Sequence, residues 1–97
     1  MSYPYAEARV LANLGTLYVQ QKNPEDAASC FKEASVCASR AGDLLFQTRQ
    51  LINLARVAKR FEAHTVVKQA IDVATRLCVA IHFDEGRKQL AALATSP

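Results

Sequence analysis

Long apolar runs are missing from this sequence. No stretch approaches the ~20 consecutive apolar residues that a membrane span requires, although apolar residues make up 51% of the 97 positions. That share is too high for a disordered chain. The first residues carry an acid at Glu7 and lack the apolar segment of a secretory signal. We therefore expect one folded domain, spanning 1–97, in the cytoplasm and without membrane contact.

Cysteine is scarce, and its spacing argues against disulfides and metal sites. The three cysteines are an odd number, and Cys30 and Cys37 lie seven residues apart on one expected helix. Their Cα atoms would be roughly 10 Å apart at ~1.5 Å per residue, beyond the ~7 Å that a disulfide can bridge. Neither His64 nor His82 stands at zinc-ligand spacing from a cysteine. We expect Cys30, Cys37 and Cys78 to fill the core as small apolar residues, with no metal site.

Signatures of catalysis are also missing. The chain has no glycine-rich phosphate loop, no paired carboxylates in an apolar setting and no evident Ser–His–Asp spacing. We therefore expect neither an enzyme nor a cofactor. The net charge of +3 is mild, and few aromatic residues stand among the basic ones. Nucleic-acid binding is therefore not expected either.

No segment shows the two-residue alternation of a strand, and helical spacing runs throughout. Asn23 and Asp43 are suited to cap helices, Pro24 fits a first helical position, and Gly42 fits the end of a helix. Asp84 is expected to cap the last helix. The break before the fourth helix carries neither glycine nor proline. The expected helices are 4–21, 24–41, 43–61, 63–81 and 84–95.

A repeat of forty residues organises the chain. Residues 9–15 read Arg-Val-Leu-Ala-Asn-Leu-Gly, residues 49–55 read Arg-Gln-Leu-Ile-Asn-Leu-Ala, and a weaker copy begins at Lys88. An isolated helical hairpin cannot cover its apolar seam, whereas stacked hairpins can. The seam expected on the first helix consists of Leu11, Leu14, Leu17 and Tyr18. The sequence thus predicts an all-α fold, a short α-solenoid of antiparallel helical hairpins with repeats at 4–41 and 43–81 and a C-terminal helix at 84–95.

These residues resemble the tetratricopeptide repeat (TPR) family. The forty-residue spacing exceeds the usual one of about 34. It is similar to the lengthened repeats of kinesin light chains and of spindle-orientation adaptors built on Leu-Gly-Asn repeats. The resemblance implies an extended peptide in a concave groove, its backbone hydrogen-bonded by Asn13 and Asn53. The carboxylate-clamp subgroup is not matched, because Ala12 and Thr16 replace its Lys and Asn. The family pattern is met by Leu11, Leu14, Gly15, Tyr18, Ala27, Phe31 and Ala34.

One face of the repeated helices carries the candidate binding residues. Arginine forks onto carboxylates, and asparagine offers a donor and an acceptor to a peptide backbone. We therefore predict an adaptor that binds an extended or acidic segment of a partner protein. Each arginine could instead belong to a solvated face, and the asparagines could bond within the stack. The candidate peptide-binding residues are Arg9, Asn13, Thr16, Arg49, Ile52, Asn53, Arg56, Arg60 and Lys88, with Ile52 as an apolar patch.

A second reading is self-association. Helical repeats usually need at least three units for stability, whereas this chain has two and one further helix. Its end helices leave seams that another copy could cover, so a homo-oligomer is the alternative to the adaptor. Tyr3, Tyr5 and Phe83 are expected to cover the ends of the stack. The sequence does not identify the partner or the pathway.

Overall fold

The computed structural model describes residues 3–95, and in that range it contains five helices and no strand. The helix bounds agree with the expected ones to within one residue at each end, and the all-α prediction is confirmed. The terminal positions 1–2 and 96–97 of the expected domain lie outside the described residues. Within the described part, no helix has the length and apolar character needed to cross a bilayer. The helices are α1 (Pro4–Gln20), α2 (Pro24–Arg40), α3 (Leu44–Arg60), α4 (His64–Ala80) and α5 (Asp84–Thr95).

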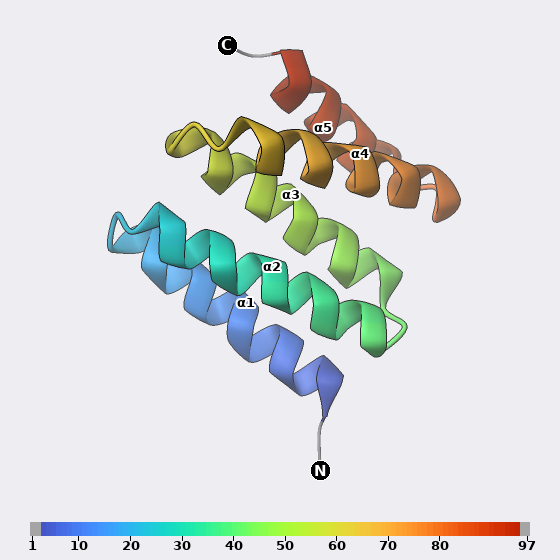
Figure 1. Cartoon of the computed structure of the whole chain (residues 1–97). Coiled ribbons are helices and arrows are strands. Elements are labelled where there is room, and N and C mark those ends of the chain that lie inside the picture. The colour runs from blue at the N-terminus through green and yellow to red at the C-terminus, as the bar shows by residue number, and fades with distance from the viewer. Residues whose placement is uncertain (1–2, 96–97) are drawn as a thin grey trace.

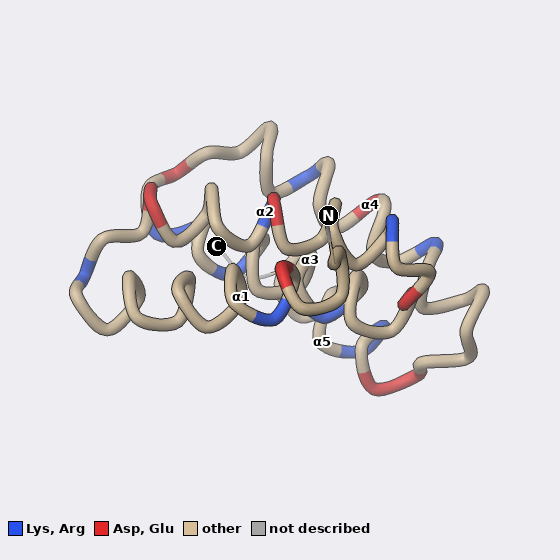
Figure 2. The backbone as a smooth tube through the Cα atoms, turned by 90° about the horizontal axis from the view of Figure 1, so that it is seen from below, with Lys and Arg blue, Asp and Glu red and all other residues tan. Residues whose placement is uncertain are grey.

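The helices form a stack in which each one packs against the next along the chain. The two ends of the chain lie at opposite ends of the stack (Figure 1). Seen along a perpendicular direction, α2 and α4 form one layer while α1, α3 and α5 form the other (Figure 2). Contact between α3 and α5 also continues the second layer. This is the α-solenoid of antiparallel hairpins that the repeat predicts.

Every connection between helices is the same three-residue turn, and the helices begin at 20-residue intervals. In each turn one residue adopts the left-handed conformation, and the following N–H bonds back to a carbonyl five residues earlier. This is the Schellman motif, which satisfies carbonyls at a helix end. The left-handed residues are Lys22 (φ 59°), Gly42 (φ 74°), Glu62 (φ 57°) and His82 (φ 57°). The N–H to carbonyl distances are 2.9 Å for Asn23–Tyr18, 3.0 Å for Asp43–Ala38, 3.1 Å for Ala63–Ala58 and 2.8 Å for Phe83–Cys78.

Two of the three predicted helix caps are present. The side chain of Asn23 accepts a hydrogen bond from the N–H of Asp26 at 3.4 Å, and that of Asp43 accepts one from Phe46 at 2.9 Å. The prediction that Asp84 caps α5 is wrong, because the uniform turn makes Asp84 the first helical residue. Its charge still lies at the positive end of the helix dipole.

Glycine occupies only one of the four left-handed positions, which leads to a stability prediction. A residue with a side chain pays about 1–2 kcal/mol to adopt this conformation. Glycine avoids that cost, but the greater flexibility of its unfolded chain offsets roughly 0.5–1 kcal/mol of the benefit. We expect Glu62→Gly to raise the free energy of unfolding by about 0.5–1 kcal/mol in urea denaturation. Glu62→Ala keeps the strain and should give no such gain. Equal effects of the two substitutions would contradict this account of the turn.

The core lies between the two layers and depends on close approach of α1 and α2. A Cβ atom at Gly15 would stand 2.8 Å from the ring of Phe31, so only glycine fits without a shift. Small residues let the helices approach elsewhere, and Ala27, Ala34, Ala55, Ala58 and Ala74 have no exposed surface. The seam expected on α1 is only partly correct. Leu11 and Tyr18 are half-buried, whereas Leu14 and Leu17 are exposed, because within residues 3–95 no helix packs over that side of α1.

Candidate functional site

The predicted residues of α1 face those of α3 across a hollow of about 220 Å³. Arg9, Asn13 and Thr16 form the α1 wall, and Asn53 stands on the α3 wall. Ala12, Phe46 and Gln50 complete the lining. The forty-residue repeat thus places the two asparagines on opposite sides of one depression.

Two further hollows adjoin this depression, one farther along α3 and one on the α5 side of α3. One of about 210 Å³ is shared by Thr16, Asn53, Arg56 and Arg60. The other, of about 480 Å³, lies toward α5. Asn53 borders all three hollows, which we together name the α3 groove. On the α5 side the groove is lined by Phe46, Arg49, Gln50, Ile52, Asn53, Arg56, Phe83, Glu85 and Gln89.

The two asparagines differ in how they are held. Asn13 is exposed, whereas Asn53 is half-buried and its Nδ2 donates to Gln50 Oε1 at 3.2 Å. Gln50 is itself buried. This hydrogen bond stays within α3, so it orients the Asn53 amide without joining two helices. The Asn53 amide, held in this orientation, lies where the three hollows of the groove meet.

Positive charge in the groove comes mainly from α3. This helix carries four basic residues and no acid, whereas the other eight basic residues of the chain are outnumbered by its nine acids. Arg56 Nη2 donates to Gln89 Oε1 at 3.2 Å, and the Arg49 guanidinium lies 5.8 Å from the Phe83 ring centroid. The second geometry is that of a cation–π contact. Arg56 is therefore held against α5, and Arg49 is held against the residue that directly precedes α5.

Two predicted site residues are placed differently from the prediction. Ile52 is 3% exposed and belongs to the core cluster, so it forms the floor of the groove rather than an exposed apolar patch. On α5 the groove is lined by Gln89 and not by Lys88. The helix starts place Gln89, not Lys88, forty residues after Arg49. A shift of one residue turns a side chain by about 100° around the helix axis, so Lys88 points away from this wall.

Several groove residues were not predicted from the sequence. Gln50 is equivalent to Val10 of the first repeat, and Phe46 is equivalent to Ala6. The repeat therefore does not predict a polar or an aromatic side chain at these two positions. Glu85 and Gln89 belong to α5, where the weaker copy that begins at Lys88 is one residue out of register with the helix starts. The 20-residue spacing of the helix starts is the signal that would have placed Gln89.

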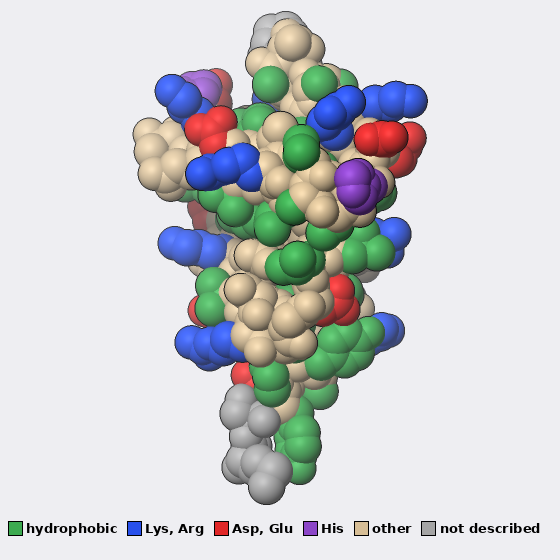
Figure 3. Space-filling model, turned by 90° about the vertical axis from the view of Figure 1, so that its right-hand side faces the viewer, with side chains coloured by type: hydrophobic (Ala, Val, Ile, Leu, Met, Phe, Trp, Pro, Cys, Tyr) green, Lys and Arg blue, Asp and Glu red, His purple; other side chains and the backbone are tan. Residues whose placement is uncertain are grey.

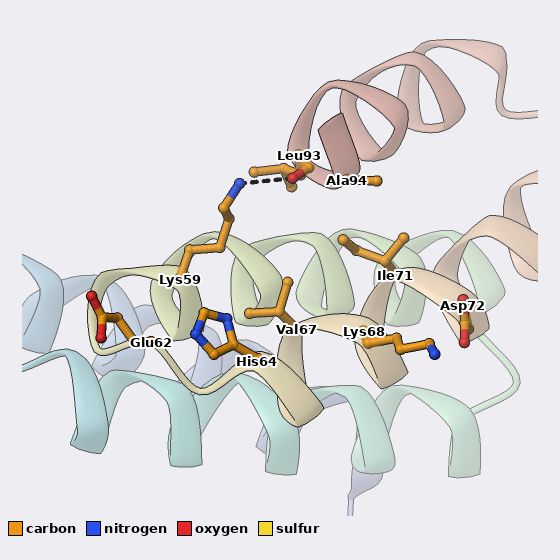
Figure 4. Close-up of a pocket in the computed structure, with 9 residues that line it drawn as sticks. All are labelled: Lys59, Glu62, His64, Val67, Lys68, Ile71, Asp72, Leu93 and Ala94. Atoms are coloured by element: carbon orange, nitrogen blue, oxygen red, sulfur yellow. Dashed lines mark hydrogen bonds between the residues drawn. The ribbon is translucent and has the colours of Figure 1, made fainter. Parts of the chain in front are cut away.

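A separate hollow of about 490 Å³ lies at the C-terminal end of the stack, between the start of α4 and the end of α5 (Figure 4). Val67, Ile71 and Leu93 give it an apolar lining. Lys59 Nζ donates to the Leu93 carbonyl at 2.7 Å. Because the last carbonyls of a helix lack partners within it, this bond ties the end of α5 to α3. His64 also lines this hollow and is exposed.

The cysteines are buried and free, as predicted. Burial raises the pKa of all three thiols above the ordinary value, and the nearby Glu7 carboxylate raises that of Cys37 further. The Cys37 thiol also donates to Glu7 Oε2 at 3.8 Å. A protonated buried thiol packs like a small apolar side chain. The cysteines therefore serve the core and not the groove.

Comparisons with known proteins add no family to this geometry. No protein-family model matches the chain, and no significant match was found among curated proteins or among solved structures. Within residues 3–95, no three His, Cys, Asp or Glu side chains cluster closely enough to hold a metal ion. The amides and arginines of the α3 groove form the candidate site.

Proposed function

We propose that this chain is a TPR-type interaction module that holds an extended, acidic segment of another protein in the α3 groove. The observation that carries the proposal is the position of Asn53, which borders all three hollows beside the basic side chains of α3. An amide there can donate to and accept from a peptide backbone. Arg56 and Arg60 supply charge that favours carboxylates.

The shape of the groove favours an extended ligand over a compact one. The hollows lie on both sides of α3 and are open to solvent, so a chain that crosses α3 in them would contact α1, α3 and α5 in turn. The molecule is 42 Å in its longest dimension. An extended peptide of about 12 residues covers roughly 40 Å. A peptide of that length can therefore reach every part of the groove.

The α5 end of the groove already holds an acid. Gln89 Nε2 donates to Glu85 Oε1 at 3.5 Å, and Gln89 in turn accepts from Arg56. Glu85 thus offsets part of the positive charge near Arg49. Arg60, at the other end of α3, has no acid lining its hollow. The acidic residues of the ligand are therefore expected near Arg56 and Arg60.

Binding of a designed peptide pair tests the proposal. Two fluorescein-labelled peptides of about 12 residues would differ only in having glutamate or glutamine at alternate positions. We expect the glutamate peptide to bind at least about 10-fold more tightly by fluorescence anisotropy, since a charge-assisted hydrogen bond contributes about 1.5–3 kcal/mol. Its affinity should also fall as salt is added. Equal affinity for the two peptides would refute the acidic preference.

Matched variants locate the binding site. Asn53→Ala with Arg56→Glu should weaken binding of the glutamate peptide about 100-fold, because an amide contact is lost and a repulsive charge is added. Lys68→Glu with Arg76→Glu changes two basic residues of α4 and lowers the net charge at least as much. This control should retain binding to within a few-fold. If both double variants lose affinity equally, the attraction is a general charge effect and the groove proposal fails.

Self-association is a second candidate function, and one observation favours it. The outer side of α1 exposes large apolar side chains that a monomer leaves uncovered. Helical repeat proteins need polar caps at their ends to remain soluble. This surface lies on a different side of α1 from the groove residues, so the two functions are compatible.

A further inference from the structure

The outer face of α1 carries a continuous apolar stripe made of Val10, Leu14 and Leu17. These side chains are 65%, 38% and 51% exposed, and they share one helix face at i, i+4, i+7 spacing. Tyr3, which directly precedes α1, is also exposed and lines the same hollow as Val10. We call this surface the α1 stripe. It is turned by about 100° from Arg9, Asn13 and Thr16 of the groove, each of which precedes a stripe residue by one position.

The repeat shows what kind of surface the α1 stripe is. Forty residues later, the same helical positions are occupied by Gln50, Leu54 and Val57, and all three are buried. Leu54 and Val57 belong to the core cluster that α3 shares with α2. A stripe at this position is therefore a packing surface for a helix wherever a neighbouring helix exists. On α1 it has none within the described residues.

The opposite end of the stack is built differently. On α5 the large apolar residues Leu90 and Leu93 are turned inward, and among the described residues none of the exposed large apolar side chains belongs to α5. Charged side chains of both signs gather at this upper end of the molecule (Figure 3). A polar outer face is typical of a finished end of a helical array. The hollow at that end has apolar side chains, but charged side chains of both signs line it as well, so it matches an apolar stripe less well than another apolar stripe does.

A second copy offers the same stripe as an apolar match. Antiparallel pairing about Leu14 sets Val10 of one copy near Leu17 of the other. Beside Val10 lies a hollow of about 520 Å³, lined also by Tyr3, Ala6 and Leu11, which has room for the second copy's Leu17. A two-fold arrangement of this kind is the commonest form of homodimer.

Charge also favours the antiparallel arrangement. Glu7 and Glu33 line the hollow at one end of the α1 stripe, whereas Lys22 follows the helix at its other end. Antiparallel pairing brings Lys22 of each copy toward Glu7 of the other. Parallel pairing would instead place the glutamates of both copies together, which is repulsive.

We infer that the α1 stripe is the interface of a homodimer in which two copies pair through antiparallel α1 helices. The inference concerns a surface outside the α3 groove and does not depend on peptide binding. Sedimentation of the 97-residue chain over a range of concentrations should show a monomer–dimer equilibrium. Leu14→Lys should weaken the dimer by about 100-fold or more, because the change occurs twice at the centre of a symmetric interface.

A matched control and a charge pair make the test specific. Val79→Lys adds the same charge at an apolar side chain of α4 that is 56% exposed, and it should leave the dimer unchanged. Mixing Leu14→Lys chains with Leu14→Glu chains should restore a heterodimer, because the two-fold axis sets residue 14 against its own copy. Circular dichroism and thermal melting would establish that both variants remain folded.

Three results would overturn the inference. A wild-type chain that stays monomeric at every concentration would leave the stripe to a helix of another protein or of a longer chain. A dimer that survives Leu14→Lys must use another surface. Assemblies that grow beyond two copies indicate a head-to-tail contact and not a closed pair.

Discussion

Replacing Phe31 with alanine is expected to lower the free energy of unfolding by about 3–5 kcal/mol. Its ring is 3% exposed and lies in the core cluster between the two layers. It also fills the space that the missing side chain of Gly15 leaves open. A chain of this size has little stability to lose. Urea denaturation followed by circular dichroism would measure the change, and Val36→Ala, at an exposed position of the same helix, should cost less than about 1 kcal/mol.

A double-mutant cycle tests whether Gly15 and Phe31 are coupled, because the effect of Gly15→Ala on stability is expected to change sign when Phe31 is replaced. In the wild-type chain, Gly15→Ala should destabilise by about 1–3 kcal/mol, because the new Cβ would press against the Phe31 ring. In the Phe31→Ala background the same change should stabilise by up to about 1 kcal/mol, since alanine is the better helix former and the space is empty. Equal effects of Gly15→Ala in both backgrounds would show that the two residues are not coupled.

The second large effect is expected at Leu90. This side chain is fully buried, and its replacement by alanine should cost about 2–5 kcal/mol. The α5 helix is shorter than the others and packs on α3 and α4. We therefore expect the loss to fall on α5, which should detach while the rest of the stack stays folded. Hydrogen exchange would then show lost protection in α5 and retained protection in α1 and α2.

An exposed substitution on the same helix provides the control. Lys88→Ala leaves the buried side of α5 intact and should preserve the exchange pattern of the wild type. If Leu90→Ala instead lowered protection equally in all five helices, the stack would unfold as one unit. In that case the contacts of α5 would be coupled to the whole fold more strongly than the packing indicates.

The helices could be predicted from the sequence because their ends are marked by local chemistry. Pro24, Gly42 and Asp43 act through backbone geometry and capping, which need no knowledge of tertiary structure. The start of α4 carries no such mark, since Ala63 provides no side-chain cap. It is nevertheless fixed by the period, because the earlier helix starts recur every 20 residues. Where a helix start lacks a capping residue, proline or glycine, the 20-residue period therefore predicts its position better than local sequence does.

The groove was predicted less completely, because burial depends on neighbours that the sequence does not display. Asn13, Asn53 and Arg49 could be found because identity and register repeat together. Ile52 lies one position from Asn53, and its burial follows from the packing of the core around α3. The prediction for Lys88 is wrong because the residues that it matches in the second repeat lie 39 positions earlier, whereas equivalent helix positions are 40 residues apart. The exposure of Leu14 has the same kind of cause, since it depends on whether a helix precedes α1.

The uniform turn has a mechanical consequence for the groove. Because one backbone geometry joins every pair of consecutive helices, the pitch of the stack is set four times by the same few dihedral angles. A small change in those angles would accumulate along the chain and alter the distance between the α1 and α5 walls. The width of the groove is thus governed by the whole series of turns together, and no single hinge controls it.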